Sequence, residues 1–216
     1  MLTIIQKAQE ALSDILFPAC CMGCKKEGLY LCESCQTFLS ESECICPVCR
    51  RESDTGERHS QCSPSSLDGL VSIWEYEGPF KRMIDEAKEK GFSHIFRELT
   101  DRAILSLTQD PRYDLFLKFL SREETILTYI PTEEREERRR GFNQARSIAE
   151  RLGTVFRVQV TDALEKDTQG AVVVGDIWET GNTMKERALA LKRSGAVTIW
   201  GFTLGRAPYV YQNAHV

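Results

Sequence analysis

Four pairs of metal-ligand residues lie close together near the N-terminus. Each pair leaves two residues between its members, and the pairs are Cys21 and Cys24, Cys32 and Cys35, Cys46 and Cys49, and His59 and Cys62. This spacing lets two side chains of a short turn reach one tetrahedral zinc ion while nearby amides donate hydrogen bonds to the thiolates. Because four protein ligands leave no open position on zinc, we expect one or two structural zinc ions.

The sequence leaves the grouping of these ligands open. Successive ribbons would join the first pair to the second and the third to the fourth, whereas a cross-brace would interleave them. The short gap between Cys24 and Cys32 favours successive ribbons. His59 is the weakest of the eight ligands, since it could be an exposed loop histidine and Cys44 could compete with it. We expect Cys20 and Cys44 to bind no metal, and the absence of a βα context argues against a redox CxxC motif.

A second set of residues could bind an anion. The β-branched residues Val172 to Val174 precede Gly175 and Asp176, and the following loop supplies Glu179, Thr180, Gly181, Asn182 and Thr183. A buried strand, such a loop and a helix together present free amides to a phosphate, and the helix dipole favours its charge. We expect Thr183 to cap a helix from about Met184, and Asp176 to face a sugar or a metal as the candidate catalytic residue. An αβ unit without any ligand would show a similar pattern.

The elements that position these residues follow an α/β pattern from Asp68 onward, which is typical of a parallel sheet flanked by helices. We expect strands over Gly69–Tyr76, Ile126–Ile130, Val155–Val160, Val172–Gly175 and Ala196–Leu204. We expect helices around Met83 to Lys88, over Phe92–Leu107, through Ala145 to Leu152, and from Met184 to Ser194 with Gly195 as a left-handed cap.

Length and composition limit the class of protein. A chain of 216 residues accommodates one α/β domain and a small module, and its formal net charge of −4 argues against a surface covered with nucleic-acid contacts. No stretch of 18 apolar residues occurs, and polar residues interrupt the expected N-terminal helix over Leu2 to Phe17. We therefore expect a cytoplasmic protein without membrane insertion. Its parts would be a helix (1–18), a double zinc ribbon (19–66) and an α/β domain (67–216).

Several motifs in this order resemble the ComF family. They are Leu16-Phe17-Pro18 before the CxxC series, Tyr76-Glu77-Gly78 with Ile84 and Lys88, Ile130-Pro131, Arg140-Gly141-Phe142-Asn143-Gln144, the segment from Val172 to Thr183, and Thr203-Leu204-Gly205-Arg206. Proteins of this family join an N-terminal double zinc ribbon to a type I phosphoribosyltransferase-like domain and are associated with DNA uptake during natural competence. The string from Arg140 to Gln144 is the most specific to the family.

The resemblance implies a site for phosphoribosyl pyrophosphate (PRPP) or another nucleotide phosphate, with magnesium bridging ribose and pyrophosphate oxygens. The 5′-phosphate would lie on the loop from Glu179 to Thr183, and the ribose would lie near Asp176. The pyrophosphate would lie near Pro131, and the residues implied around the ligand are Arg140, Asn143, Gln144 and Lys88. The resemblance also implies single-stranded DNA and a competence helicase as partners.

Two departures from the family pattern leave transferase activity open. Gly175 replaces the first acid of the PRPP motif, and Glu179 replaces its first hydroxyl residue. The connection is also shortened between about 165 and 172, where the family carries a further strand and a mobile catalytic loop, which would complete the site. The alternative is a noncatalytic adaptor that binds single-stranded DNA or a DNA-uptake helicase through basic residues, namely Lys25, Lys26, Arg50, Arg51 and Arg58.

Overall fold

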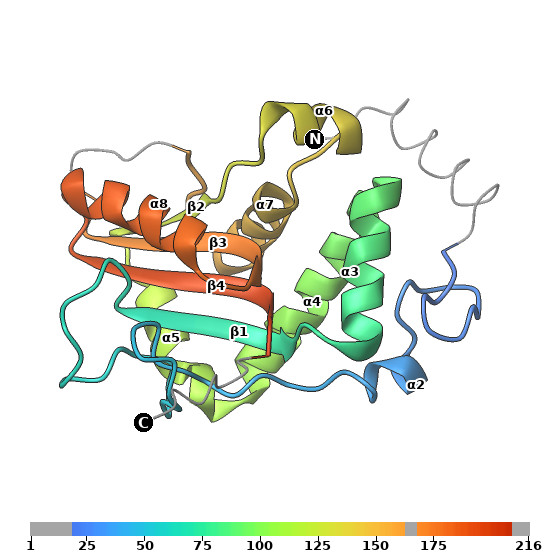
Figure 1. Cartoon of the computed structure of the whole chain (residues 1–216), viewed down its shortest axis with the longest axis horizontal. Coiled ribbons are helices and arrows are strands. Elements are labelled where there is room, and N and C mark those ends of the chain that lie inside the picture. The colour runs from blue at the N-terminus through green and yellow to red at the C-terminus, as the bar shows by residue number, and fades with distance from the viewer. Residues whose placement is uncertain (1–18, 163–167, 209–216) are drawn as a thin grey trace, which may run out of the picture.

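The computed structural model describes residues 19–162 and 168–208, so the expected N-terminal helix and the middle of the shortened connection lie outside the described residues. The fold is α/β, as the sequence predicts, with a parallel sheet between helices and a cysteine-rich segment that runs along the sheet (Figure 1). The cysteine-rich segment contains one short helix, α2 (Glu33–Gln36).

All four strands of the sheet are parallel and follow the order β1-β4-β3-β2. Their bounds are β1 (Gly69–Glu75), β2 (Thr125–Tyr129), β3 (Gly170–Trp178) and β4 (Thr198–Arg206). Val172, Val173 and Val174 are fully buried in the inner strand β3, because helices cover both of its faces. This strand extends through Asp176 to Trp178, further than the sequence predicts.

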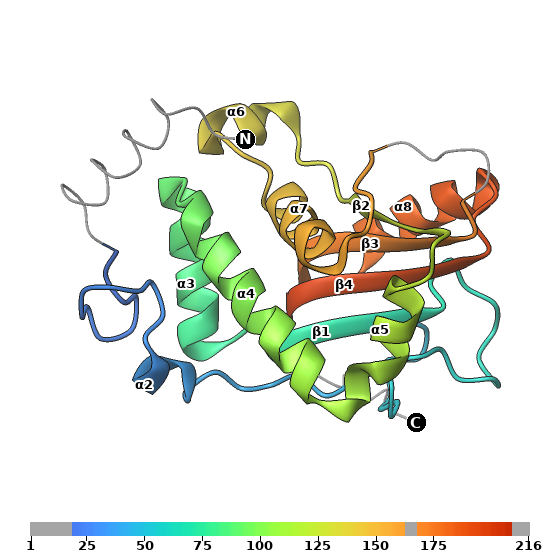
Figure 2. The same ribbon diagram turned by 180° about the vertical axis from the view of Figure 1, so that it is seen from behind.

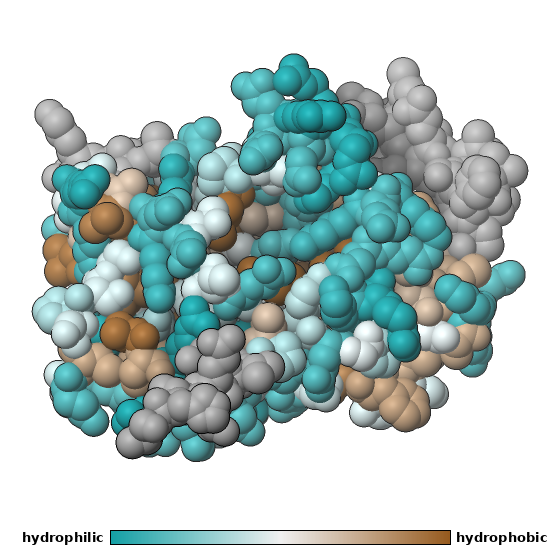
Figure 3. All heavy atoms as spheres, viewed as in Figure 1, coloured by the Kyte–Doolittle hydropathy of each residue, from teal (hydrophilic) through white to brown (hydrophobic). Residues whose placement is uncertain are grey.

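Helices cover the two faces unequally. One face carries α8 (Asn182–Arg193), and the other carries α4 (Ser93–Gln109), α5 (Asp114–Leu120) and α7 (Gln144–Phe156), with the 3-10 turn η1 (Pro111–Tyr113) before α5 (Figure 2). The remaining helices, α3 (Gly78–Lys90) and α6 (Glu134–Arg140), stand beside the carboxyl ends of the strands. Figure 3 shows hydrophilic side chains gathered over α6 and α3 on the face seen there.

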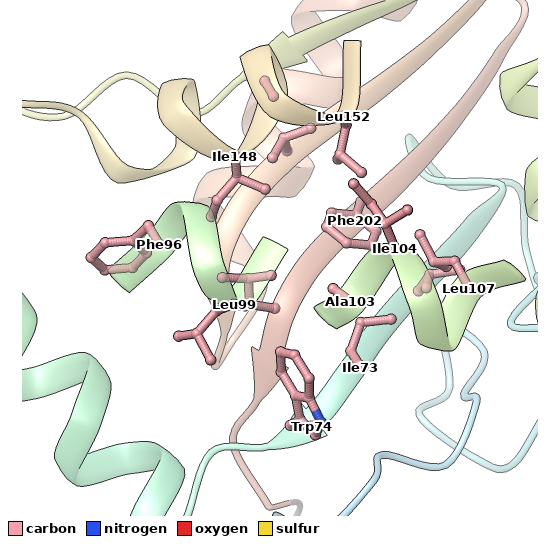
Figure 4. Packing of buried hydrophobic residues seen from close by; sticks show 14 of the residues in the cluster. Ile73, Trp74, Phe96, Leu99, Ala103, Ile104, Leu107, Ile148, Leu152 and Phe202 are labelled. Atoms are coloured by element: carbon pink, nitrogen blue, oxygen red, sulfur yellow. The ribbon is translucent and has the colours of Figure 1, made fainter. Parts of the chain in front are cut away.

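The main hydrophobic core holds α4 and α7 against the sheet. Leu99, Ala103 and Leu107 recur at helical spacing on one side of α4 and are fully buried. They meet Leu152 of α7 and Phe202 of β4, which are also fully buried (Figure 4). Burial of each large side chain contributes about 1.5–3 kcal/mol, so this cluster fixes α7 and the loop before it relative to the strand ends.

The expected strand over Val155 to Val160 is wrong. Helix α7 continues through Phe156, and Arg157 ends it in the left-handed conformation with a φ of 58°. Only Val160 pairs with the sheet, through one parallel bridge to Leu127 on the outer edge of β2. Gly153 allows this crossing, since a Cβ there would lie 2.5 Å from Cγ2 of Val160. Within residues 155–162 the chain therefore forms a single bridge beside β2 and no strand.

Both ends of α8 depend on glycine. The expected cap at Thr183 is wrong, because Gly181 occupies the N-cap position and Thr183 lies inside the first turn. At the other end Gly195 has a φ of 111°, as the sequence predicts. Its amide bonds the carbonyl of Lys192, and the amide of Ala196 bonds that of Leu191, which is the Schellman arrangement.

The cysteine-rich segment packs directly on the α/β domain. The amide of Ser42 donates to the carbonyl of Ile73, and Leu31 and Leu39 belong to the same hydrophobic cluster as Ile73. A bidentate contact fixes the chain just before Cys32, because the amides of Tyr30 and Leu31 both donate to the Glu98 carboxylate of α4 at 3.0 Å. The position of the first metal-ligand group is thus set by the main core.

Candidate functional site

Two groups of metal-ligand side chains form in the cysteine-rich segment. In each group all ligand atoms lie within 4.8 Å of one another, and the groups are Cys21, Cys24, Cys32 and Cys35, and Cys46, Cys49, His59 and Cys62. This is the successive grouping that the sequence favours, with His59 as the fourth ligand of the second group. Cys20 and Cys44 belong to neither group.

The donor geometry fits zinc. Tetrahedral Zn–S bonds of about 2.3 Å place two sulfurs about 3.8 Å apart. The Sγ atoms of Cys24 and Cys32 are 3.6 Å apart, and those of Cys46 and Cys62 are 3.8 Å apart. His59 Nε2 lies 2.9 Å from the carbonyl oxygen of Glu52, which as an acceptor fixes the proton on Nε2 and leaves Nδ1 for the metal. Both groups could therefore bind one zinc ion each.

Each group contains one thiol that ionises easily. Burial raises the pKa of Cys21, but amide donors from Cys32, Cys24 and Gly23 outweigh that effect and lower it to about 6. Burial likewise opposes ionisation of Cys46, yet the surrounding amides lower its pKa to about 7. Such amide donors stabilise the thiolate that a zinc ion requires.

The CxxC turns that begin at Cys21 and at Cys46 are structural repeats, and we call them the first and the second knuckle. In the first, the amide of Cys21 donates to the carbonyl of Lys26, and Lys25 has a φ of 64°. In the second, the amide of Cys46 donates to the carbonyl of Arg51, and Arg50 has a φ of 59°. A basic residue therefore occupies the same left-handed position after each second cysteine.

A polar pocket lies beyond the carboxyl ends of β2 and β3, where ligands bind in open parallel sheets. Its volume is 390 Å³, and its lining includes Lys88 of α3, Arg140 of α6, Gln144 of α7 and Asp176 of β3. Four residues proposed from the sequence thus converge from four elements. We call this cavity the polar pocket.

Both cations of the polar pocket are paired. Lys88 Nζ lies 2.6 Å from Asp176 Oδ2, and Arg140 Nη2 lies 2.8 Å from Glu136 Oε2. With Glu133 also in the lining, two positive and three negative side chains give the pocket a formal charge of −1. A divalent cation bound together with a polyphosphate would offset part of this repulsion.

Two residues that line the polar pocket, Arg140 and Gln144, each carry one buried donor that makes no hydrogen bond within the described part of the chain. These donors are Arg140 Nε and Gln144 Nε2. The Gln144 side chain is nearly inaccessible, with 3% of the residue exposed, and Arg140 Nη1 lies 3.5 Å from its Oε1. Because an unsatisfied buried donor costs about 1–3 kcal/mol, these groups favour a hydrogen-bond acceptor.

A smaller pocket adjoins the first. It has a volume of 140 Å³ and is lined by Trp178, Met184 and the loop from Glu179 to Thr183. Ile130 lines both pockets, so they meet at the end of β2. Gly181 has a φ of 76°, and a Cβ there would lie 2.3 Å from the Trp178 ring, so only glycine fits this turn. We call this cavity the loop pocket.

Gly175 and Glu179, the two residues that differ from the family motif, lie in different surroundings. Gly175 is enclosed, since a Cβ would lie 3.1 Å from Ile130 Cδ1 and 3.2 Å from Met184 Cε. A larger acidic side chain would need these apolar groups to move. Glu179 is exposed at the loop, where solvent reduces its repulsion of a phosphate.

Asn143 lies apart from the polar pocket. Its Oδ1 accepts a hydrogen bond from the Arg146 amide as the N-cap of α7, and its Nδ2 donates to the carbonyl of Ile130. The side chain therefore holds α7 to the end of β2.

The sequence analysis did not identify Glu136, the ion-pair partner of Arg140. Glu136 lies one helical turn before Arg140, and this spacing indicates a pair only once α6 is known to be a helix.

No family model matches the chain, and neither does any curated protein. Within residues 19–162 and 168–208, no helix combines the length and apolar character needed to cross a bilayer.

Proposed function

We propose that this chain is a ComF-like protein with a phosphoribosyltransferase fold that binds PRPP together with magnesium and acts in DNA uptake. The observation that carries the proposal is the unused donor pair, Arg140 Nε and Gln144 Nε2, beside Lys88 in the polar pocket. The link to DNA uptake rests on the resemblance of the motifs.

A ligand with two anionic ends suits the two adjoining pockets. The pyrophosphate would occupy the polar pocket, where Arg140 and Gln144 supply buried donors. The 5′-phosphate would occupy the loop pocket at the start of α8, whose first amides lack intrahelical partners. The sugar between them would pass Ile130, which lines both cavities.

The carboxylates of the polar pocket favour a ligand that binds together with magnesium. Magnesium binds through one or two carboxylates together with phosphate oxygens, and it would offset the negative charge of the polar pocket. Asp176 is held by Lys88 at the end of β3, where its charge could stabilise positive charge that develops on the sugar during transfer.

The adaptor alternative has less support. Two of the five basic residues assigned to DNA contact are engaged within the chain, because Arg50 donates to the carbonyl of Thr180 and Arg58 donates to that of Cys62. Lys25, Lys26 and Arg51 remain exposed on the cysteine-rich segment.

Calorimetry with PRPP, with and without magnesium, tests the proposal. We expect binding only with magnesium, and we expect Arg140→Met to weaken it about 10- to 100-fold, as loss of a charged hydrogen bond would. The matched control is Arg139→Met, because Arg139 is the exposed neighbour on α6. Equal affinity of both variants, or no binding by the wild type, would refute the proposal.

A further inference from the structure

The second CxxC knuckle contacts the loop of the proposed phosphate site. Arg50 follows Cys49, and its Nη2 donates to the backbone carbonyl of Thr180 at 2.6 Å. The Arg50 backbone is fixed by its left-handed conformation and by the bond from its amide to the carbonyl of Cys46. One side chain therefore joins a metal-ligand turn to a loop 130 residues away in sequence.

Apolar packing supports the same contact. Ile45, the residue before Cys46, is buried in the cluster that contains Trp178 and Met184. The Trp178 ring in turn lies directly beneath Gly181. The second knuckle, the tryptophan and the loop thus form one packed unit.

Two cations gather in this unit. Lys185 Nζ lies 5.7 Å from the centre of the Trp178 ring. Burial lowers the pKa of Lys185, and the positive charge of Arg50 lowers it further. Both side chains add positive charge beside the loop, where the exposed Glu179 carries the opposite charge.

The first knuckle offers a natural contrast. Lys25 occupies the position equivalent to Arg50 but is exposed, and the following residues Tyr30 and Leu31 dock on Glu98 of α4. The two repeats therefore share a backbone turn and differ in what their basic residue contacts.

We infer that the second knuckle positions the loop from Glu179 to Thr183 through Arg50, so that metal binding at this knuckle controls the loop's hold on phosphate. Arg50 is a positioning residue, since it holds the backbone carbonyl of Thr180 in the loop that lines the loop pocket. The identity of the phosphate ligand rests on the proposed function, whereas the positioning of the loop does not.

Hydrogen exchange at the amides from Thr180 to Met184 tests the inference without a ligand. We expect Arg50→Gln to retain two zinc ions and to raise loop exchange about 10-fold, the effect of losing a charged hydrogen bond of about 1.5 kcal/mol. Arg50→Lys should restore part of the protection, and the matched control Lys25→Gln should leave it unchanged. Unchanged loop exchange in Arg50→Gln would overturn the inference.

Variants that remove one metal ligand provide a second, independent test of the inference. Cys62→Ser, which removes a ligand of the second group, should raise loop exchange and weaken PRPP binding with magnesium, whereas Cys35→Ser in the first group should change neither. Equal effects of the two variants would contradict the inference. If the wild type binds no PRPP while Arg50→Gln and Cys62→Ser still raise loop exchange, the proposed function fails and the positioning of the loop by the second knuckle stands.

Discussion

Replacing Gly181 by alanine should destabilise the protein strongly. The same substitution at a second glycine, Gly141, measures the backbone part of this destabilisation separately. Gly181 has φ and ψ of 76° and 4°, and Gly141 has nearly the same angles, 80° and −1°. They differ in their surroundings, because a Cβ at Gly181 would lie 2.3 Å from the Trp178 ring and one at Gly141 would meet nothing within 4 Å. Gly141→Ala is therefore the matched control.

The expected magnitudes follow from this difference. Each alanine incurs a left-handed backbone cost of about 1–2 kcal/mol. Only Gly181→Ala must also displace a buried indole ring, which adds about 1–3 kcal/mol, as overpacking of a core does. We expect the free energy of unfolding to fall by about 1–2 kcal/mol for Gly141→Ala and by about 2–5 kcal/mol for Gly181→Ala.

Guanidinium denaturation of zinc-loaded protein, followed by tryptophan fluorescence, measures both changes. The near-ultraviolet circular dichroism of Gly181→Ala should also change, because the ring beneath the loop must move. Two variants whose unfolding free energies agree within about 0.5 kcal/mol would show that Trp178 does not support the loop.

Three further outcomes are expected. Cys21→Ser should bind one zinc ion fewer than the wild type in a metal assay, whereas Cys20→Ser, its immediate neighbour outside both ligand groups, should bind as many. Glu136→Gln should tighten PRPP binding in calorimetry about 3- to 10-fold, since it removes a like charge near the pyrophosphate and releases Arg140; unchanged or weaker binding would contradict the charge argument. Asn143→Ala should lower the free energy of unfolding by about 1–2 kcal/mol, because it removes the cap of α7 and the bond to Ile130, and a change below about 0.5 kcal/mol would contradict that role.

Local patterns were sufficient for much of the fold. The run from Val172 to Val174 predicted a buried strand because β-branched residues suit a sheet covered on both faces. The seven-residue gap between Cys24 and Cys32 favoured the successive grouping of the ligands, and the structure has that grouping.

The remaining features depend on tertiary contacts. Val155 and Phe156 have strand-forming side chains, yet α7 includes both, because the helix buries Ile148 and Leu152 against the core. The N-cap of α8 is Gly181 and not the predicted Thr183. The Trp178 ring packs against this turn and leaves room there for glycine alone.

Part of the site likewise could not be predicted from the sequence. Lys88, Arg140, Gln144 and Asp176 were identified from motifs, and they line one pocket. The Lys88–Asp176 ion pair and the contact of Arg50 with Thr180 were not predictable, because they join segments far apart in sequence. No local pattern specifies such partners.

The most direct test of the account is a crystal structure of the chain with PRPP and magnesium. We predict pyrophosphate density in the polar pocket, within hydrogen-bond distance of Arg140 and Gln144, and 5′-phosphate density against the amides of the loop from Thr180 to Thr183. Crystals in which both pockets remain empty at saturating ligand, or in which PRPP binds elsewhere on the chain, would contradict the account.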